Sequence, residues 1–118
     1  MTFERMMLMV MRVSIAFQVV VGLALWAGHW KQLTDAHVNV GILFVLLLWF
    51  LGVTRLVKGP DRALAALAIA WGAAVGYVGF TQQSLLLGDL HWVVRPGHLA
   101  IGMLAMPIAE RLGKSGRR

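Results

Sequence analysis

The sequence predicts an all-α fold in which four helices cross a membrane as an up-down bundle, and composition is the first reason. Of the 118 residues, 59% are hydrophobic and only 14% are charged, whereas a soluble domain carries about 25% charged residues. A soluble domain of this length buries only about two-thirds of its surface, so the remaining apolar area would face water in large patches. The mean hydropathy of +0.76 therefore indicates that lipid surrounds the chain.

Length sets the number of helices. A spanning helix uses about 20 apolar residues, so four spans and their short connections fill the 118 residues as a single integral membrane domain, residues 1–118. The same length and the shortage of polar sequence exclude a nucleotide-binding fold. The absence of cysteine excludes a disulfide scaffold.

The first two spans are predicted at about residues 6–29 and 36–57. The first closes beside Trp26 and Trp30, which are typical of a membrane surface. It is also too long for the hydrophobic region of a secretory signal peptide, so we expect no such leader. The polar segment 31–35 separates it from the second span, which is apolar almost throughout.

The third span is predicted at about residues 63–86. It begins after Pro60 and Asp61, because proline ends the preceding helix and an aspartate can cap the next one. Within it, Gly72 and Gly76 have the spacing that lets two helices approach closely in lipid.

The fourth span is predicted at about residues 91–112. Pro96 and Gly97 are expected to interrupt it, and the apolar run that follows them is too short to cross a bilayer. We therefore extend the span back to His91.

Lysine and arginine give the predicted orientation, because positive residues favour the cytoplasmic face. Nine of the eleven lie in the amino-terminal segment, the loop after the second span and the carboxyl-terminal segment, and only Lys31 and Arg95 lie on the other face. Both termini are thus predicted to be cytoplasmic, in a bacterial inner membrane. The cations that set this orientation also account for the net charge of +6, so we expect no nucleic acid partner.

All four histidines fall toward the outer face of the predicted bundle, in two similar loops. One loop reads His29-Trp30, six residues, His37-x-x-x-Gly41, and the other reads His91-Trp92, five residues, His98-x-x-x-Gly102. This repeat predicts two helical hairpins related by a pseudo-twofold axis along the membrane normal. Under that symmetry His37 and His98 are equivalent.

His37 and His98 are predicted to bind haem b. The second and fourth spans lie on a diagonal of an up-down bundle, so a side chain from each can point at the central axis. Two imidazoles can then hold the iron from opposite faces of the ring. Gly41 and Gly102, one turn further along, leave space for the macrocycle. Arg95 is placed to pair with a haem propionate, and further candidates for that role are Lys31, His29 and His91.

The other two histidines, His29 and His91, have two possible interpretations. His29 and His91 are candidate ligands of a second haem. The alternative is that each only presents its polar edge to water beside the neighbouring tryptophan at the membrane surface.

The arrangement resembles one half of haem A synthase, whose two parallel four-span halves each carry haem-ligating histidines on their second and fourth spans. His37 and His98 match the two ligand positions, and Gln18 and Gly22 look like the Gln-x-x-x-Gly stretch common in the family's helices. The family's catalytic half has a glutamate three residues before the span-two histidine, where this chain has Thr34, and the paired-cysteine loop of some members is absent. The resemblance therefore implies a small bis-histidine haem b membrane protein and does not imply farnesyl-haem oxidation.

A six-coordinate haem has no open site for substrate, so we expect electron transfer or haem carriage and not a stand-alone enzyme. Expected partners besides the bilayer are a quinol or a redox protein, and a second copy or a larger membrane complex. Weak candidates for quinol contacts are Gln18, Gln82 and Gln83. Two alternatives stay open. One is a divalent-metal protein that uses the four histidines together, since neutral imidazole suits zinc and copper. The other is a structural accessory subunit.

Overall fold

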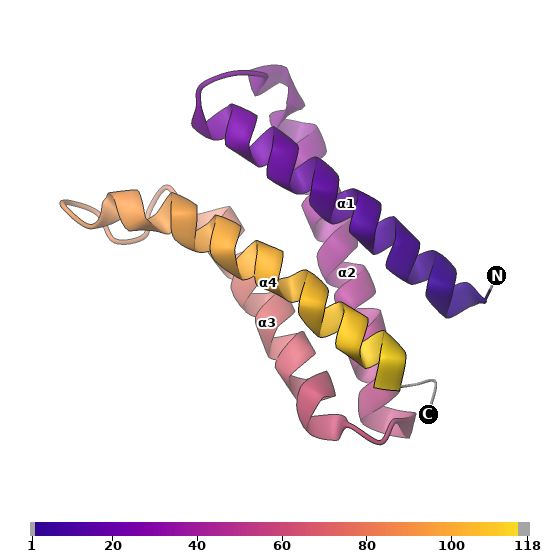
Figure 1. Ribbon diagram of the computed structural model, residues 1–118. Coiled ribbons are helices and arrows are strands. Elements are labelled where there is room, and N and C mark those ends of the chain that lie inside the picture. The colour runs from indigo at the N-terminus through magenta and orange to yellow at the C-terminus, as the bar shows by residue number, and fades with distance from the viewer. Residues whose placement is uncertain (1, 116–118) are drawn as a thin grey trace.

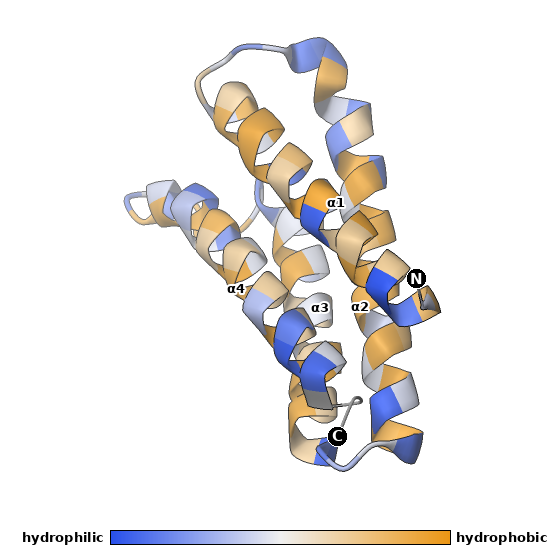
Figure 2. Cartoon of the chain, turned by 45° about the vertical axis from the view of Figure 1, so that its right-hand side comes forward, coloured by the Kyte–Doolittle hydropathy of each residue, from blue (hydrophilic) through white to orange (hydrophobic). Residues whose placement is uncertain are grey.

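The structure of the protein, a computed structural model, describes residues 2–115, which form four α-helices and two short 3₁₀-helices (Figure 1). The α-helices are α1 (Phe3–Trp26), α2 (Thr34–Lys58), α3 (Arg62–Thr81) and α4 (Val94–Ser115), and the 3₁₀-helices η1 (Lys31–Leu33) and η2 (His91–Val93) lead into α2 and α4. Each of the four, with η1 and η2 added to α2 and α4, is long and apolar enough to cross a membrane. Hydrophobic residues occupy most of each helix (Figure 2). The prediction of an all-α protein with four membrane-length helices is confirmed.

Local sequence explains how α1 ends and α3 begins. Gly28 has a left-handed φ of 86°, and its amide donates to the Leu25 carbonyl at 3.0 Å while the His29 amide donates to the Ala24 carbonyl at 2.8 Å. These two bonds form the Schellman motif, which favours glycine because it has no Cβ. At the start of α3, the Asp61 carboxylate accepts from the Leu64 amide at 3.2 Å, which confirms the predicted cap.

The third helix is shorter than predicted. It ends at Thr81, five residues before the expected end near residue 86. The Thr81 hydroxyl donates to the Tyr77 carbonyl at 2.6 Å, and Ser84 bonds back to the Thr81 carbonyl. Leu86 and Gly88 then take positive φ angles of 48° and 100°, which a helix cannot contain. Hydropathy alone missed this end because leucines 85–87 continue the apolar run beyond the last helical turn.

The fourth helix is continuous where an interruption was expected. Pro96 is the third residue of α4, and in the first turn the amide that proline lacks would have no partner within the helix in any case. With η2 in front, the apolar segment runs from His91 to Lys114, so the extension back to His91 is confirmed. The proline inside the helix is Pro107.

The core lies in the half of the bundle that contains the start of α1 and the end of α4. Both α1 and α3 pack against α2 and against α4. Leucine and methionine side chains on α1, α2 and α4 meet small residues on α3 and α4, and the core includes Leu8, Met11, Leu48, Leu51, Ala65, Ala68, Ala105, Ala109 and Leu112. The α1–α2 and α3–α4 connections lie apart from each other, so the two hairpins separate away from this core (Figures 1 and 2). The bundle is therefore closed at one end and opens at the other.

Polar contacts also tie the closed end together. Arg12 of α1 makes a two-pronged ion pair with Glu110 of α4, with N···O distances of 2.5 and 2.8 Å. Arg55 of α2 pairs with Glu4 at 2.5 Å, and its Nε donates to the Leu112 carbonyl at 3.1 Å. Arg55 thus joins α2 to both α1 and α4.

We expect Arg55→Met to lower the free energy of unfolding by about 1–3 kcal/mol, because hydrogen bonds to charged groups contribute about 1.5–3 kcal/mol each. The Arg55 and Glu4 side chains are only 14% and 27% exposed, so solvent does not replace the lost partner fully. Unfolding by denaturant in detergent micelles measures the change. Lys58→Met, an exposed cation in the same helix, is the control and should alter stability by no more than about 0.5 kcal/mol. Equal losses in the two variants would contradict this role of Arg55.

Candidate functional site

A cavity of about 900 Å³ occupies the open half of the bundle, between all four helices. Its volume falls within the range of about 300–1,000 Å³ that is usual for small-molecule and cofactor sites. Most of its wall is apolar. Its polar lining residues come from the helices and the two connections and are Gln18, Lys31, Thr34, His37, Gln82, Gln83, His91, Arg95 and His98.

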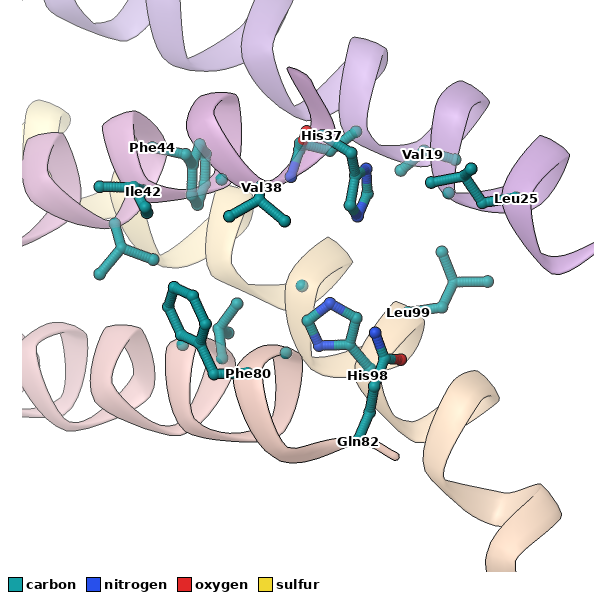
Figure 3. A pocket seen from close by; sticks show the side chains of 18 of the residues that line it. Val19, Leu25, His37, Val38, Ile42, Phe44, Phe80, Gln82, His98 and Leu99 are labelled. Carbon is teal, nitrogen blue, oxygen red and sulfur yellow. The ribbon is translucent and has the colours of Figure 1, made fainter. Parts of the chain in front are cut away.

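His37 and His98 lie on opposite sides of this cavity, and their rings point toward one another (Figure 3). His37 is in the first turn of α2 and His98 in the second turn of α4. Both side chains are half-buried, and the Nδ1 atom of each is buried with no hydrogen-bond partner in the described part of the chain. The structure therefore brings together two imidazoles, one from α2 and one from α4, as the repeat in the sequence predicted.

Each imidazole rests against a glycine of the preceding helix. A Cβ built on Gly22 of α1 would lie 3.2 Å from Cε1 of His37, and a Cβ built on Gly79 of α3 would lie 3.0 Å from Cε1 of His98. Real Cβ atoms rarely make such short contacts, so any larger residue at either position would displace the ring. The sequence pattern alone did not mark these glycines as part of the site. Gly22 belongs to the Gln-x-x-x-Gly stretch, but which ring it faces depends on how the helices pack.

The glycines predicted to flank the ligands are not equivalent. Both Gly41 and Gly102 line the cavity. A Cβ on Gly41 would lie only 2.7 Å from Nε2 of Gln18, so that space is filled by a side chain of α1. Beside Gly102, and beside Gly76 on α3, no atom from elsewhere in the described chain lies within 4 Å of a built Cβ.

Gly72 has the packing role predicted for it. Its built Cβ would lie 2.6 Å from Nε1 of Trp49, and that indole nitrogen donates to the Ile69 carbonyl at 3.0 Å. This close approach joins α2 to α3. Gly76 makes no such contact, so of the predicted packing pair only Gly72 has this role.

The outer polar residues divide into two groups. Arg95, Lys31 and His91 line the cavity, and Arg95 and Lys31 are exposed there as cations. His91 Nδ1 lies 2.8 Å from the Leu85 carbonyl, which holds its ring against the α3–α4 connection. His29 is exposed and lies outside the cavity lining.

The histidine side chains of the cavity are arranged to hold a ligand from two sides and not to enclose a metal ion. Among the described residues, no group of three or more His, Asp or Glu side chains converges on one point, whereas protein zinc sites use three or four such ligands. The four histidines thus do not converge on one point in the described part of the chain. Two opposed imidazoles supply one nitrogen donor to each face of a planar ligand.

The chain was compared with models of protein families, with curated proteins and with solved structures, and none of them matches it.

Proposed function

We propose that this chain is a membrane-embedded haem b protein in which His37 and His98 bind the iron from opposite faces of the ring. The observation that carries the proposal is the pair of imidazoles that face one another across a cofactor-sized, mostly apolar cavity. Ionisable side chains within a membrane are costly and are usually functional. Haem bound in this way supplies one-electron redox chemistry.

The rest of the cavity suits the shape and charge of this ligand. The open spaces beside Gly76 and Gly102 leave room for a flat macrocycle between the rings. Arg95 and Lys31 line the cavity on the connection side, where their positive charge favours a carboxylate, which arginine can bind in a bidentate manner. These residues would hold the propionates, while the histidines hold the ring centre.

We also propose how the two hairpins are related and how the bundle is oriented in the membrane. The hairpins α1–α2 and α3–α4 are related by a pseudo-twofold axis, each contributing one glycine and one histidine in the same order. The cation-rich closed end is cytoplasmic, so the haem lies near the outer face of a bacterial inner membrane. With both axial positions taken by the protein, the site passes electrons or carries haem, and a quinol or a redox protein is the partner.

An absorption spectrum of the purified protein tests this directly. The chain is expressed in cells that make haem, purified in detergent and compared in its oxidised and reduced forms. We expect sharp reduced-minus-oxidised bands of low-spin haem b, with one haem per chain by the pyridine haemochrome assay. A folded but colourless protein, which also binds no added haemin, would contradict the proposal. Zinc or copper in that colourless protein would favour the divalent-metal alternative, and the absence of both would favour the accessory subunit.

A further inference from the structure

The two halves of the site differ at the position one helical turn away from the glycine that faces each histidine. The contacts of the glycines show the register of each hairpin: Gly22 of α1 is opposite His37, and Gln18, one turn away from Gly22, is opposite Gly41. In the other hairpin Gly79 is opposite His98. One turn away from Gly79 stands Val75, which also lines the cavity. Glutamine in one hairpin thus corresponds to valine in the other.

Gln18 and His37 project between the same two helices, and each has one buried polar atom without a hydrogen-bond partner in the described residues. Residues four apart on a helix have Cβ atoms about 5–6 Å apart on one face, so the Gln18 amide, which fills the space beside Gly41, lies next to the His37 ring. The Gln18 Oε1 and the His37 Nδ1 are both buried without a hydrogen-bond partner in the described range. A buried polar atom without a hydrogen-bond partner destabilises the fold, which favours a hydrogen bond between the two atoms.

We infer that Gln18 is a positioning residue whose Oε1 accepts a hydrogen bond from Nδ1–H of His37, so that Nε2 of that ring keeps its lone pair for a ligand. The terminal torsion of glutamine is broad, so the amide can turn to make this bond without moving α1. The hydrogen bond at one imidazole nitrogen decides which nitrogen is free to bind a metal. The inference rests on the proposed function for the identity of the ligand, but the hydrogen bond itself does not depend on haem.

The inference makes the two histidines chemically unequal. Gln18 provides an amide acceptor one turn away from Gly22, whereas the position one turn away from Gly79 is an apolar valine, and the amide drawn beside His98 is that of Gln82 in the α3–α4 connection (Figure 3). An acceptor on the distal nitrogen raises the basicity of an imidazole ligand and so favours the ferric over the ferrous state. Gln18 would therefore lower the reduction potential of the site, and it would act through His37 without touching the iron.

Nitrogen-15 NMR of histidine-labelled, haem-free protein in micelles tests the hydrogen bond. We expect the neutral His37 ring to carry its proton on Nδ1 in the wild type and to move it to Nε2 in Gln18→Leu, with the His37 signals identified by their loss in His37→Asn. Val75→Leu is the control and should leave the His37 tautomer unchanged. A proton on Nε2 in the wild type, or the same tautomer in Gln18→Leu, would overturn the inference even if the protein binds haem.

The haem-loaded protein gives a second readout. We expect Gln18→Leu to weaken ferric haem binding at least about tenfold more than ferrous binding, which raises the midpoint potential by about 59 mV for this one-electron couple. Val75→Gln should shift the potential in the opposite direction. An unchanged potential in both variants would overturn the inference. A protein that binds no haem but shows the expected tautomers would instead reject the proposed function and keep the role of Gln18.

Discussion

Replacing either His37 or His98 by alanine is expected to abolish the low-spin haem spectrum. In the proposed site each ring would supply one of the two nitrogen ligands of the iron, and neither of the other two histidines is free to replace it: His29 lies outside the cavity, and His91, which lines it, is held by the Leu85 carbonyl. Loss of an outer hydrogen bond alone costs about 10–100-fold in metal affinity, so loss of a ligand should cost more than about 100-fold. Haem titration followed by absorption measures the change.

Two controls separate ligand loss from misfolding. His29→Ala should keep the wild-type spectrum, because that side chain is exposed away from the cavity. Adding free imidazole to His98→Ala should restore six-coordinate haem, since the deleted side chain leaves a space of matching shape. If His37→Ala and His98→Ala keep wild-type spectra, the assignment of the ligands is wrong.

Replacing Gly79 by leucine is expected to remove haem binding as completely as loss of a ligand. Even a single Cβ at this position would lie 3.0 Å from Cε1 and 3.5 Å from Nε2 of His98, so a leucine and the imidazole cannot occupy the same space. Overpacking of this kind costs about 1–3 kcal/mol in a well-packed interior, and the ring can avoid it only by swinging out of line with His37. Gly22→Leu should displace His37 in the same way.

The matched control is Ala66→Leu, a substitution of similar size at an exposed position of the same helix α3. It should leave haem titration unchanged. Gly102→Leu gives a further contrast, because no other part of the described chain lies within 4 Å of a Cβ built at that position. That variant should fold with wild-type stability by denaturant unfolding and yet lose haem. Wild-type haem affinity in Gly79→Leu would show that the glycine does not limit the position of His98.

Several features of the fold are determined by local sequence. Composition and length suffice for four membrane-length helices, because lipid accepts apolar surface that water does not. Asp61 caps α3 as predicted, since a cap depends only on the residues of the next turn. The end of α3 was missed because the turn at residues 82–90, which includes the left-handed Leu86 and Gly88, ends the helix although leucines 85–87 continue the apolar run. The predicted interruption at Pro96 was wrong because a proline in the first turn of a helix does not break it.

The sequence by itself was enough to single out His37 and His98, since they recur at one offset from a glycine in two similar loops. Only the tertiary structure decided what surrounds them. Gly22 and Gly79, and not the glycines one turn along, hold the rings, and Gln18 fills the space beside Gly41 while Gly102 stays open. The physical reason is that periodicity along a helix shows which residues share a face, whereas the register between two helices is set by side chains that meet only when the helices pack.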